Sequence, residues 1–186
     1  MNEFFKENLE MKHRRFLKEK YGLEDHIIEL AEVGYAPKKA GYEFLSDEVK
    51  LKTGLFKWSD EKDRIYTPVY DRIVFPHVWK GRIEHFTNRY CGTNDEAVKS
   101  LNLFSRVEDS CVEGASSFIQ TWADQSIPYV TPHEALNINF KRTLFIVEGV
   151  GKALALAQLG FRAISKQTSQ ITEGMLPYIV SFTRKN

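Results

Sequence analysis

The stretch TLFIVEGVGKALALAQLGFRAIS, residues 143–165, holds two apolar runs on either side of a helical pattern. Residues 143–147 form a continuous apolar run, which is typical of a strand buried on both faces. Residues 152–160 repeat apolar side chains at helical spacing, and residues 161–165 read as a second short strand. A strand, a helix and a strand at this spacing indicate a βαβ unit with a parallel sheet.

Glu148 is the most informative residue of this stretch, because it follows the first strand directly and precedes Gly149. Open α/β sheets place their ligands at the carboxyl ends of parallel strands, and a carboxylate there suits a divalent metal. The alternative is a solvated glutamate at the start of the next helix, stabilised by the helix dipole. The Gly149-Val150-Gly151-Lys152 segment has too few residues between its glycines for a phosphate-binding P-loop.

The N-terminal part reads as α+β. Helices are expected over residues 2–20, 23–33 and 42–51. Strands are expected over residues 65–69, 72–75 and 82–86, with a hairpin at 78–83, and they predict a small antiparallel sheet. Residues 115–122 and 132–137 read as short helices. We place the boundary between the two parts near residue 133, which gives segments 1–132 and 133–186.

The composition of the 186 residues is that of a globular protein, with 42% hydrophobic and 27% charged residues. Twenty-six basic residues against 25 acidic ones exclude a strongly basic, DNA-coating protein, although a local basic patch remains compatible. No apolar run approaches the roughly 20 residues that a spanning helix needs, so we expect no membrane partner. Two cysteines, Cys91 and Cys111, without a CxxC motif exclude a disulfide framework and point to reduced, cytoplasmic thiols.

Basic and aromatic residues alternate through the predicted sheet. They are Arg72, Arg82 and Arg89, with Tyr70, Trp79, Phe86 and Tyr90 between or beside them. This mixture suits single-stranded nucleic acid, through phosphate contacts and base stacking. Aromatic residues of an ordinary core would give the same pattern. The basic residues within residues 12–20 of the first helix could also contact nucleic acid. The alternative is that they form an ordinary solvated helix face.

Several segments, taken in order, resemble the catalytic core of bacterial and phage-type DNA primases. They are residues 16–23, residues 26–37 with the Gly-Tyr-Ala-Pro turn, and residues 53–55, 70–76, 81–89, 99–102 and 144–161. The last segment looks like the opening of a TOPRIM domain, the α/β fold that carries the family's acidic metal site. The resemblance covers most of the chain except residues 93–132, apart from the match at 99–102.

The resemblance implies an α+β fold: a primase core subdomain over residues 1–132, followed by the first βαβ part of a TOPRIM domain over 133–186. It implies a nucleotidyltransferase that makes RNA primers on single-stranded DNA with Mg²⁺ or Mn²⁺. Its partners would be template and nucleotides, with a replicative helicase as a further candidate. Glu148 would be the catalytic, metal-binding carboxylate. Arg72, Arg89, Lys99 and Asn102 would line the template groove.

The chain departs from the family pattern at several positions. After Glu148 the only acidic residue is Glu173, so the Asp-x-Asp pair of a TOPRIM site is missing, and Lys152 stands near an expected acidic position. Thr87-Asn88 stands where the family has a double glycine, and we expect no zinc-binding domain of the family in this chain. We therefore expect a fragment that is inactive in primer synthesis by itself, from a divergent phage or mobile-element relative.

Two alternatives stay open. The first is a non-catalytic, primase-like module that binds single-stranded DNA. The second, a TOPRIM nuclease or topoisomerase fragment, is disfavoured because the match over residues 23–102 has no counterpart in those proteins.

Overall fold

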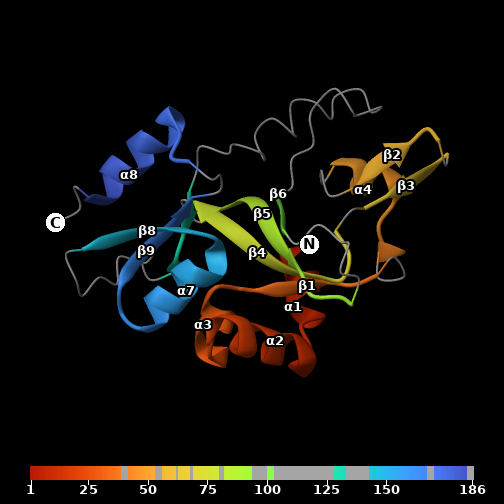
Figure 1. Ribbon diagram of the computed structural model, residues 1–186. Helices are drawn as coiled ribbons and strands as arrows, with labels where there is room; N and C mark the ends of the chain where they lie inside the picture. Colours follow the sequence, from red (N-terminus) through yellow and green to blue (C-terminus); the bar gives the residue numbers. More distant parts are fainter. Residues whose placement is uncertain are drawn as a thin grey trace.

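Four strands form one antiparallel sheet in the order β1-β4-β5-β6 (Figure 1). Their bounds are Gly34–Ala36 for β1, Arg72–Trp79 for β4, Arg82–Tyr90 for β5 and Ser100–Asn102 for β6. The β4–β5 pairing confirms the hairpin predicted at residues 78–83. The computed structural model describes residues 1–38, 42–52, 56–61, 63–67, 69–79, 82–93, 100–102, 128–132, 143–166 and 170–183.

The N-terminal segment forms two helices, α1 (Asn2–Glu7) and α2 (Met11–Tyr21), so the single helix predicted over residues 2–20 is wrong. Polar side chains at the break satisfy the backbone groups of the two helix ends. The Asn8 amide donates to the Phe4 carbonyl at 2.8 Å, and the Glu10 backbone N–H donates to Nδ1 of His13 at 3.0 Å. Helix α3 (Asp25–Leu30) is shorter than predicted and ends before Glu32, whose φ is 51°.

A two-stranded hairpin, β2 (Lys57–Ser59) with β3 (Arg64–Tyr66), follows helix α4 (Asp47–Lys52). Figure 1 shows it at the end of the molecule away from the C-terminus. The strand predicted over residues 65–69 is therefore part of a separate small sheet and ends earlier than expected. The helix predicted over residues 115–122 and most of that over 132–137 lie outside the described residues.

The βαβ unit predicted over residues 143–165 is confirmed. Strand β8 (Leu144–Glu148) runs parallel to β9 (Arg162–Lys166), and helix α7 (Val150–Gln158) connects them. Strand β7 (Tyr129–Val130) pairs antiparallel with the other edge of β9. A short 3₁₀ turn, η3 (Glu173–Met175), and helix α8 (Leu176–Thr183) follow.

The prediction that residues 143–147 are buried on both faces is wrong. In the three-stranded sheet the order is β7-β9-β8, so β8 is an edge strand among the residues that the structure describes. Phe145 and Ile146 point to opposite faces, and each is 37% exposed. The central strand β9, in contrast, is buried over Arg162–Ser165. The apolar run therefore predicted the existence of strand β8 correctly, but it did not predict that β8 lies at the edge of the sheet.

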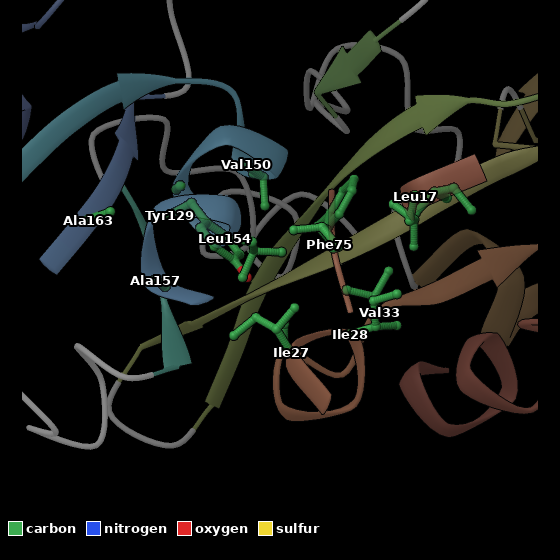
Figure 2. Close-up of a cluster of buried hydrophobic side chains, with 14 of the residues drawn as sticks. Leu17, Ile27, Ile28, Val33, Phe75, Tyr129, Val150, Leu154, Ala157 and Ala163 are labelled. Atoms are coloured by element: carbon green, nitrogen blue, oxygen red, sulfur yellow. The ribbon is translucent and has the colours of Figure 1, made fainter. Parts of the chain in front are cut away.

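One apolar cluster joins the two sheets. Ile73 and Phe75 of β4 pack with residues of α2, α3 and α7, and with Ala163 of β9. Figure 2 shows Phe75, Leu17, Ile27 and Leu154 converging in this cluster. The opposite face of the four-stranded sheet packs a second cluster around Phe5, Val74 and Phe86. Strand β7, before residue 133, pairs with β9, and helix α7, after it, contacts α2. The two parts therefore contact each other extensively, and the boundary near residue 133 stays a prediction.

Tyr21, the last residue of α2, lies against Gly151 of α7. A methyl group added at Gly151 would lie 2.6 Å from Cε1 of the Tyr21 ring. Glycine at 151 therefore lets the ring lie directly against the first turn of α7. The side-chain amide of Gln158, at the other end of α7, donates to the Gly22 carbonyl and accepts from the Glu24 backbone N–H. Helix α7 is thus held by the end of α2 at its first turn and by the segment after α2 at its last residue.

Within the described part of the chain, no helix is long and apolar enough to cross a membrane.

We predict that Gly151→Ala destabilises the protein because the new methyl group overlaps the Tyr21 ring. Overpacking of this kind costs roughly 1–3 kcal/mol, although alanine is favoured over glycine in a helix by about 1 kcal/mol. In a Tyr21→Ala background, Gly151→Ala should become neutral or stabilising. Urea unfolding of the four proteins of this double-mutant cycle measures the coupling. Equal effects of Gly151→Ala in both backgrounds would show that the contact does not matter.

We predict that His13 makes the protein less stable at acidic pH. Burial, and then the charge of Lys12, lower the pKa of His13, while Glu10 and Asp71 oppose this shift. The imidazole also stacks on Tyr35 at 3.6 Å between ring centroids, and its Nδ1 accepts a hydrogen bond. The unfolded chain therefore binds this proton more readily. Stability is complete above about pH 6.5, the ordinary histidine value, and falls as the pH falls below it.

His13→Gln should flatten this acidic loss of stability, because glutamine keeps an acceptor and does not titrate. His26, exposed on α3, provides the matched control His26→Gln. Denaturant unfolding between pH 8 and pH 5 compares the three proteins. If His13→Gln loses stability toward acid as steeply as the wild type does, another group is responsible.

Candidate functional site

Glu148 lies exposed at the carboxyl end of β8, where the sequence predicted it. The next residue, Gly149, has a φ of 86° and turns the chain into α7. This backbone conformation disfavours residues with a side chain, so the glycine allows the abrupt reversal. In the parallel register, Glu148 stands beside Lys166, the last residue of β9. An acidic and a basic residue therefore end adjacent strands at the same edge of the sheet.

Arg89 lies on β5, paired with Ile73 on one side and Ser100 on the other. Antiparallel partners share a face, so Arg89 lies on the face of the four-stranded sheet that α2 covers. The side chain is half-buried. Burial raises the pKa of Tyr21, and the positive charge of Arg89 opposes this rise. Tyr21 is therefore near Arg89 and in contact with the turn that follows Glu148.

Arg72 lies on the opposite face from Arg89, because its partner on β5 is Tyr90. It is only 5% exposed, and burial lowers its pKa. Its guanidinium donates to the Asn88 side-chain oxygen at 3.1 Å and lies over the Tyr90 ring, 5.4 Å from the centroid. These contacts stabilise the β4–β5 pair. The structure does not bring Arg72 and Arg89 to one face of the sheet, and a nucleic-acid contact of Arg72 stays a prediction.

The other two predicted nucleic-acid residues are only partly placed. The backbone of Asn102 lies on β6, paired with Thr87 of β5 and two residues from the Arg89 partner Ser100. Lys99 lies outside the described residues.

Four basic side chains of α2 have carboxylate partners. The pairs are Lys12 with Glu10, Arg14 with Asp25 and Glu29, Arg15 with Glu19, and Lys18 with Glu24. Most of these side chains are exposed, and exposed pairs contribute about 0–1 kcal/mol each. Their pairing favours the solvated helix face over a concentrated positive patch.

The carboxyl end of β8 offers one carboxylate, that of Glu148, to a metal ion. Over the described ranges, no group of three or more His, Cys, Asp or Glu side chains could hold a metal ion. Mg²⁺ prefers near-octahedral oxygen coordination, in which proteins often contribute one or two carboxylates beside substrate phosphates. Glu148 is compatible with such a ligand. It does not make a complete protein site by itself.

Sequence reasoning missed two neighbours of the predicted site. Tyr21 was interpreted only as the end of a helix. The one sequence signal of its contact is the glycine at position 151, where the Tyr21 ring leaves no room for a side chain. Lys166 is placed beside Glu148 by strand register, which the sequence pattern does not specify for a parallel pair.

Burial is the main cause that raises the pKa of the Cys91 thiol to about 11. The thiol is therefore unreactive at neutral pH, which agrees with a structural role.

Comparison with known proteins finds no matching family model and no matching curated protein. Solved structures, in contrast, match nearly the whole chain. A DnaG primase catalytic domain bound to single-stranded DNA has a TM-score of 0.71 and 22% identity, over 97% of this chain and 57% of that one. The Escherichia coli primase catalytic core gives a TM-score of 0.73 and 22% identity, over 97% and 56%.

The Aquifex aeolicus primase, comprising zinc-binding and RNA polymerase domains, gives a TM-score of 0.74 and 20% identity, over 98% of this chain and 44% of that one. The chain thus spans a little over half of the catalytic cores that it matches. The overall arrangement of helices and strands in this chain is therefore similar to that in these structures. We conclude that this protein has the fold of the bacterial DnaG primase catalytic core.

Proposed function

We propose that this chain is a primase-like module that binds single-stranded DNA for RNA primer synthesis. The observation that carries the proposal is the structural match over 97% of the chain to a primase domain whose structure was determined with single-stranded DNA. Nucleotides and a replicative helicase would be its further partners. These roles belong to the whole catalytic core, of which the chain spans part.

Within the proposed binding surface, we assign the main phosphate contact to Arg89. It is half-buried and lies near Tyr21, whose ring adjoins the turn after Glu148. The planar guanidinium group matches the geometry of a phosphate and loses little conformational entropy per hydrogen bond formed. Lys99 and Asn102 enter the proposal through their resemblance to primase segments. We assign Arg72 an indirect role, because its contacts with Asn88 and Tyr90 hold the hairpin that carries Arg89.

Glu148 is proposed as the metal-binding carboxylate of a TOPRIM-type site, with Mg²⁺ or Mn²⁺ as the ion. When bound, such an ion would neutralise phosphate charge during nucleotidyl transfer. The chain after Glu148 contains one further acidic residue, Glu173. A single strand-end carboxylate gives weak metal affinity, so this chain alone should not catalyse transfer.

The second candidate function is binding without catalysis in the intact protein. The presence of Lys152 near an acidic position of the family favours it, because a positive charge four residues after Glu148 opposes cation binding. The two candidates predict the same DNA affinity for this chain. They differ in whether a catalytic carboxylate pair is supplied from elsewhere.

We predict that the protein binds labelled single-stranded DNA with an affinity that falls as salt increases. Arg89→Ala and Lys99→Ala should each weaken binding several-fold and reduce the slope of log affinity against log salt by about 0.7. Arg64→Ala removes an exposed arginine from the separate β2–β3 sheet and is the matched control. Fluorescence anisotropy over a salt series, with circular dichroism as a folding check, measures these effects. Equal losses in all three variants would indicate non-specific charge attraction.

We predict no template-directed primer synthesis by the 186-residue chain with Mg²⁺ or Mn²⁺, and no change in that result for Glu148→Gln. The reason is the single acidic ligand at the end of β8. A gel assay with labelled nucleotides on a single-stranded template detects synthesis. Synthesis by the wild type that Glu148→Gln abolishes would instead show that the chain completes a catalytic metal site.

A further inference from the structure

A cavity of about 390 Å³ lies between helix α4 and strand β3. Figure 1 shows these two elements together at one end of the molecule. The volume falls in the range of roughly 300–1,000 Å³ that is typical of small-molecule sites. Neither Glu148 nor Arg89 is among the residues that line the cavity. The cavity is therefore separate from the carboxylate and the arginine discussed above.

Three aromatic side chains line the cavity. The rings of Tyr42 and Phe56 are buried and meet edge to face, with 5.0 Å between their centroids and 84° between their planes. Tyr66 of β3 is 41% exposed, so part of its surface stays open to a ligand. Aromatic rings attract one another in stacked and tilted arrangements beyond the gain from apolar burial. The wall therefore suits a planar aromatic molecule.

Hydrogen-bond donors and acceptors line the same cavity. The Lys50 ammonium is held by the Asp47 carboxylate at 2.9 Å, and an ammonium carries three donor hydrogens. Glu43 supplies an exposed carboxylate, which only accepts. The Thr67 hydroxyl accepts from the Val69 backbone N–H at 3.0 Å, and its own hydrogen can donate. A hydrocarbon ligand would cover these charges without pairing them, which costs free energy.

We infer that this cavity binds the base of a purine nucleoside or mononucleotide. A purine combines flat aromatic faces with an edge that carries both ring acceptors and an amino donor. Lysine pairs with the acceptors of such an edge and a carboxylate pairs with its amino group, so Lys50 and Glu43 match it. The two fused rings of a purine cover more of the aromatic wall than the single ring of a pyrimidine does, which favours the purine.

The charge around the cavity favours a single nucleotide over a DNA strand. Of the described residues that line the cavity, Lys50 is the one cation. A bound strand gains much of its affinity from several phosphate contacts, which one lysine does not supply. With Lys50 on the base edge, the phosphates of a nucleotide would lie in solvent. Binding should therefore depend little on the number of phosphates and need no Mg²⁺. In this respect it differs from the proposed primase role, in which a metal ion would neutralise phosphate charge.

Isothermal titration calorimetry of the purified chain in EDTA tests the inference, with guanosine, GMP, AMP and CMP as ligands. We expect saturable binding of GMP and AMP, and binding of CMP that is at least about five-fold weaker. The affinities of guanosine and GMP should agree within about three-fold, because the phosphate makes no contact with a cation.

Two variants remove separate parts of the cavity. Tyr66→Ala removes the exposed ring and Glu43→Ala removes the acceptor, and each should weaken GMP binding at least about five-fold. Phe44→Ala removes an exposed ring that is next to Glu43 in the sequence but does not line the cavity, and it should bind GMP like the wild type. Circular dichroism checks folding, and the exposed Glu43 covers the case in which the Tyr66 variant does not fold.

Absence of saturable binding for all the purine ligands would overturn the inference, and so would equal GMP affinities of the wild type and both cavity variants. GMP binding that needs Mg²⁺ and is lost in Glu148→Gln would place the nucleotide at the proposed metal site instead. Displacement of GMP by oligothymidine would show that a DNA strand occupies the cavity, which also contradicts the inference. Salt-dependent DNA binding by Arg89 is measured separately, so the proposed function and this site can fail independently.

Discussion

The packing of α7 between the two sheets is the interaction on which the rest of the structure depends. Ala153, Leu154 and Ala157 of this helix belong to the same cluster as Ile73 and Phe75 of the four-stranded sheet (Figure 2). The small residues of α7 let its backbone approach α2, and the Tyr21 ring lies directly on Gly151. Because only Gly149 separates Glu148 from α7, this packing also positions the end of β8 relative to the sheet that carries Arg89.

The position of a charged residue on a strand determines whether it can reach a ligand. Arg72 and Arg89 look equivalent in the sequence, since both are arginines in predicted strands with aromatic neighbours. The register of β4 against β5 places them on opposite faces. Arg72 consequently loses its water and gains contacts with Asn88 and Tyr90, whereas Arg89 keeps part of its surface. A buried guanidinium can be essential to a binding surface by stabilising the strands that present it.

Much of the fold could be predicted from local patterns, and the failures have physical causes. The βαβ unit was predictable because its residues show both the apolar run of a strand and the spacing of a helix. The break between α1 and α2 was missed because Asn8 and Glu10 act through specific hydrogen bonds to helix ends, which periodicity does not reveal. The edge position of β8 depends on which strands pair with it. Tyr21 and Lys166 entered the site only through contacts between distant segments.

The carboxylate and the strand edge make opposite demands on β8. The metal-binding role proposed for Glu148 needs the carboxyl end of the strand to stay accessible, whereas Phe145 and Ile146 lose apolar hydration when the edge is covered. Both demands can be met if the covering element pairs along the middle of the strand and brings polar groups to its end. In the proposed primase-like core those groups would be further metal ligands. The chemistry open to Glu148 is therefore set by whatever covers the strand that carries it.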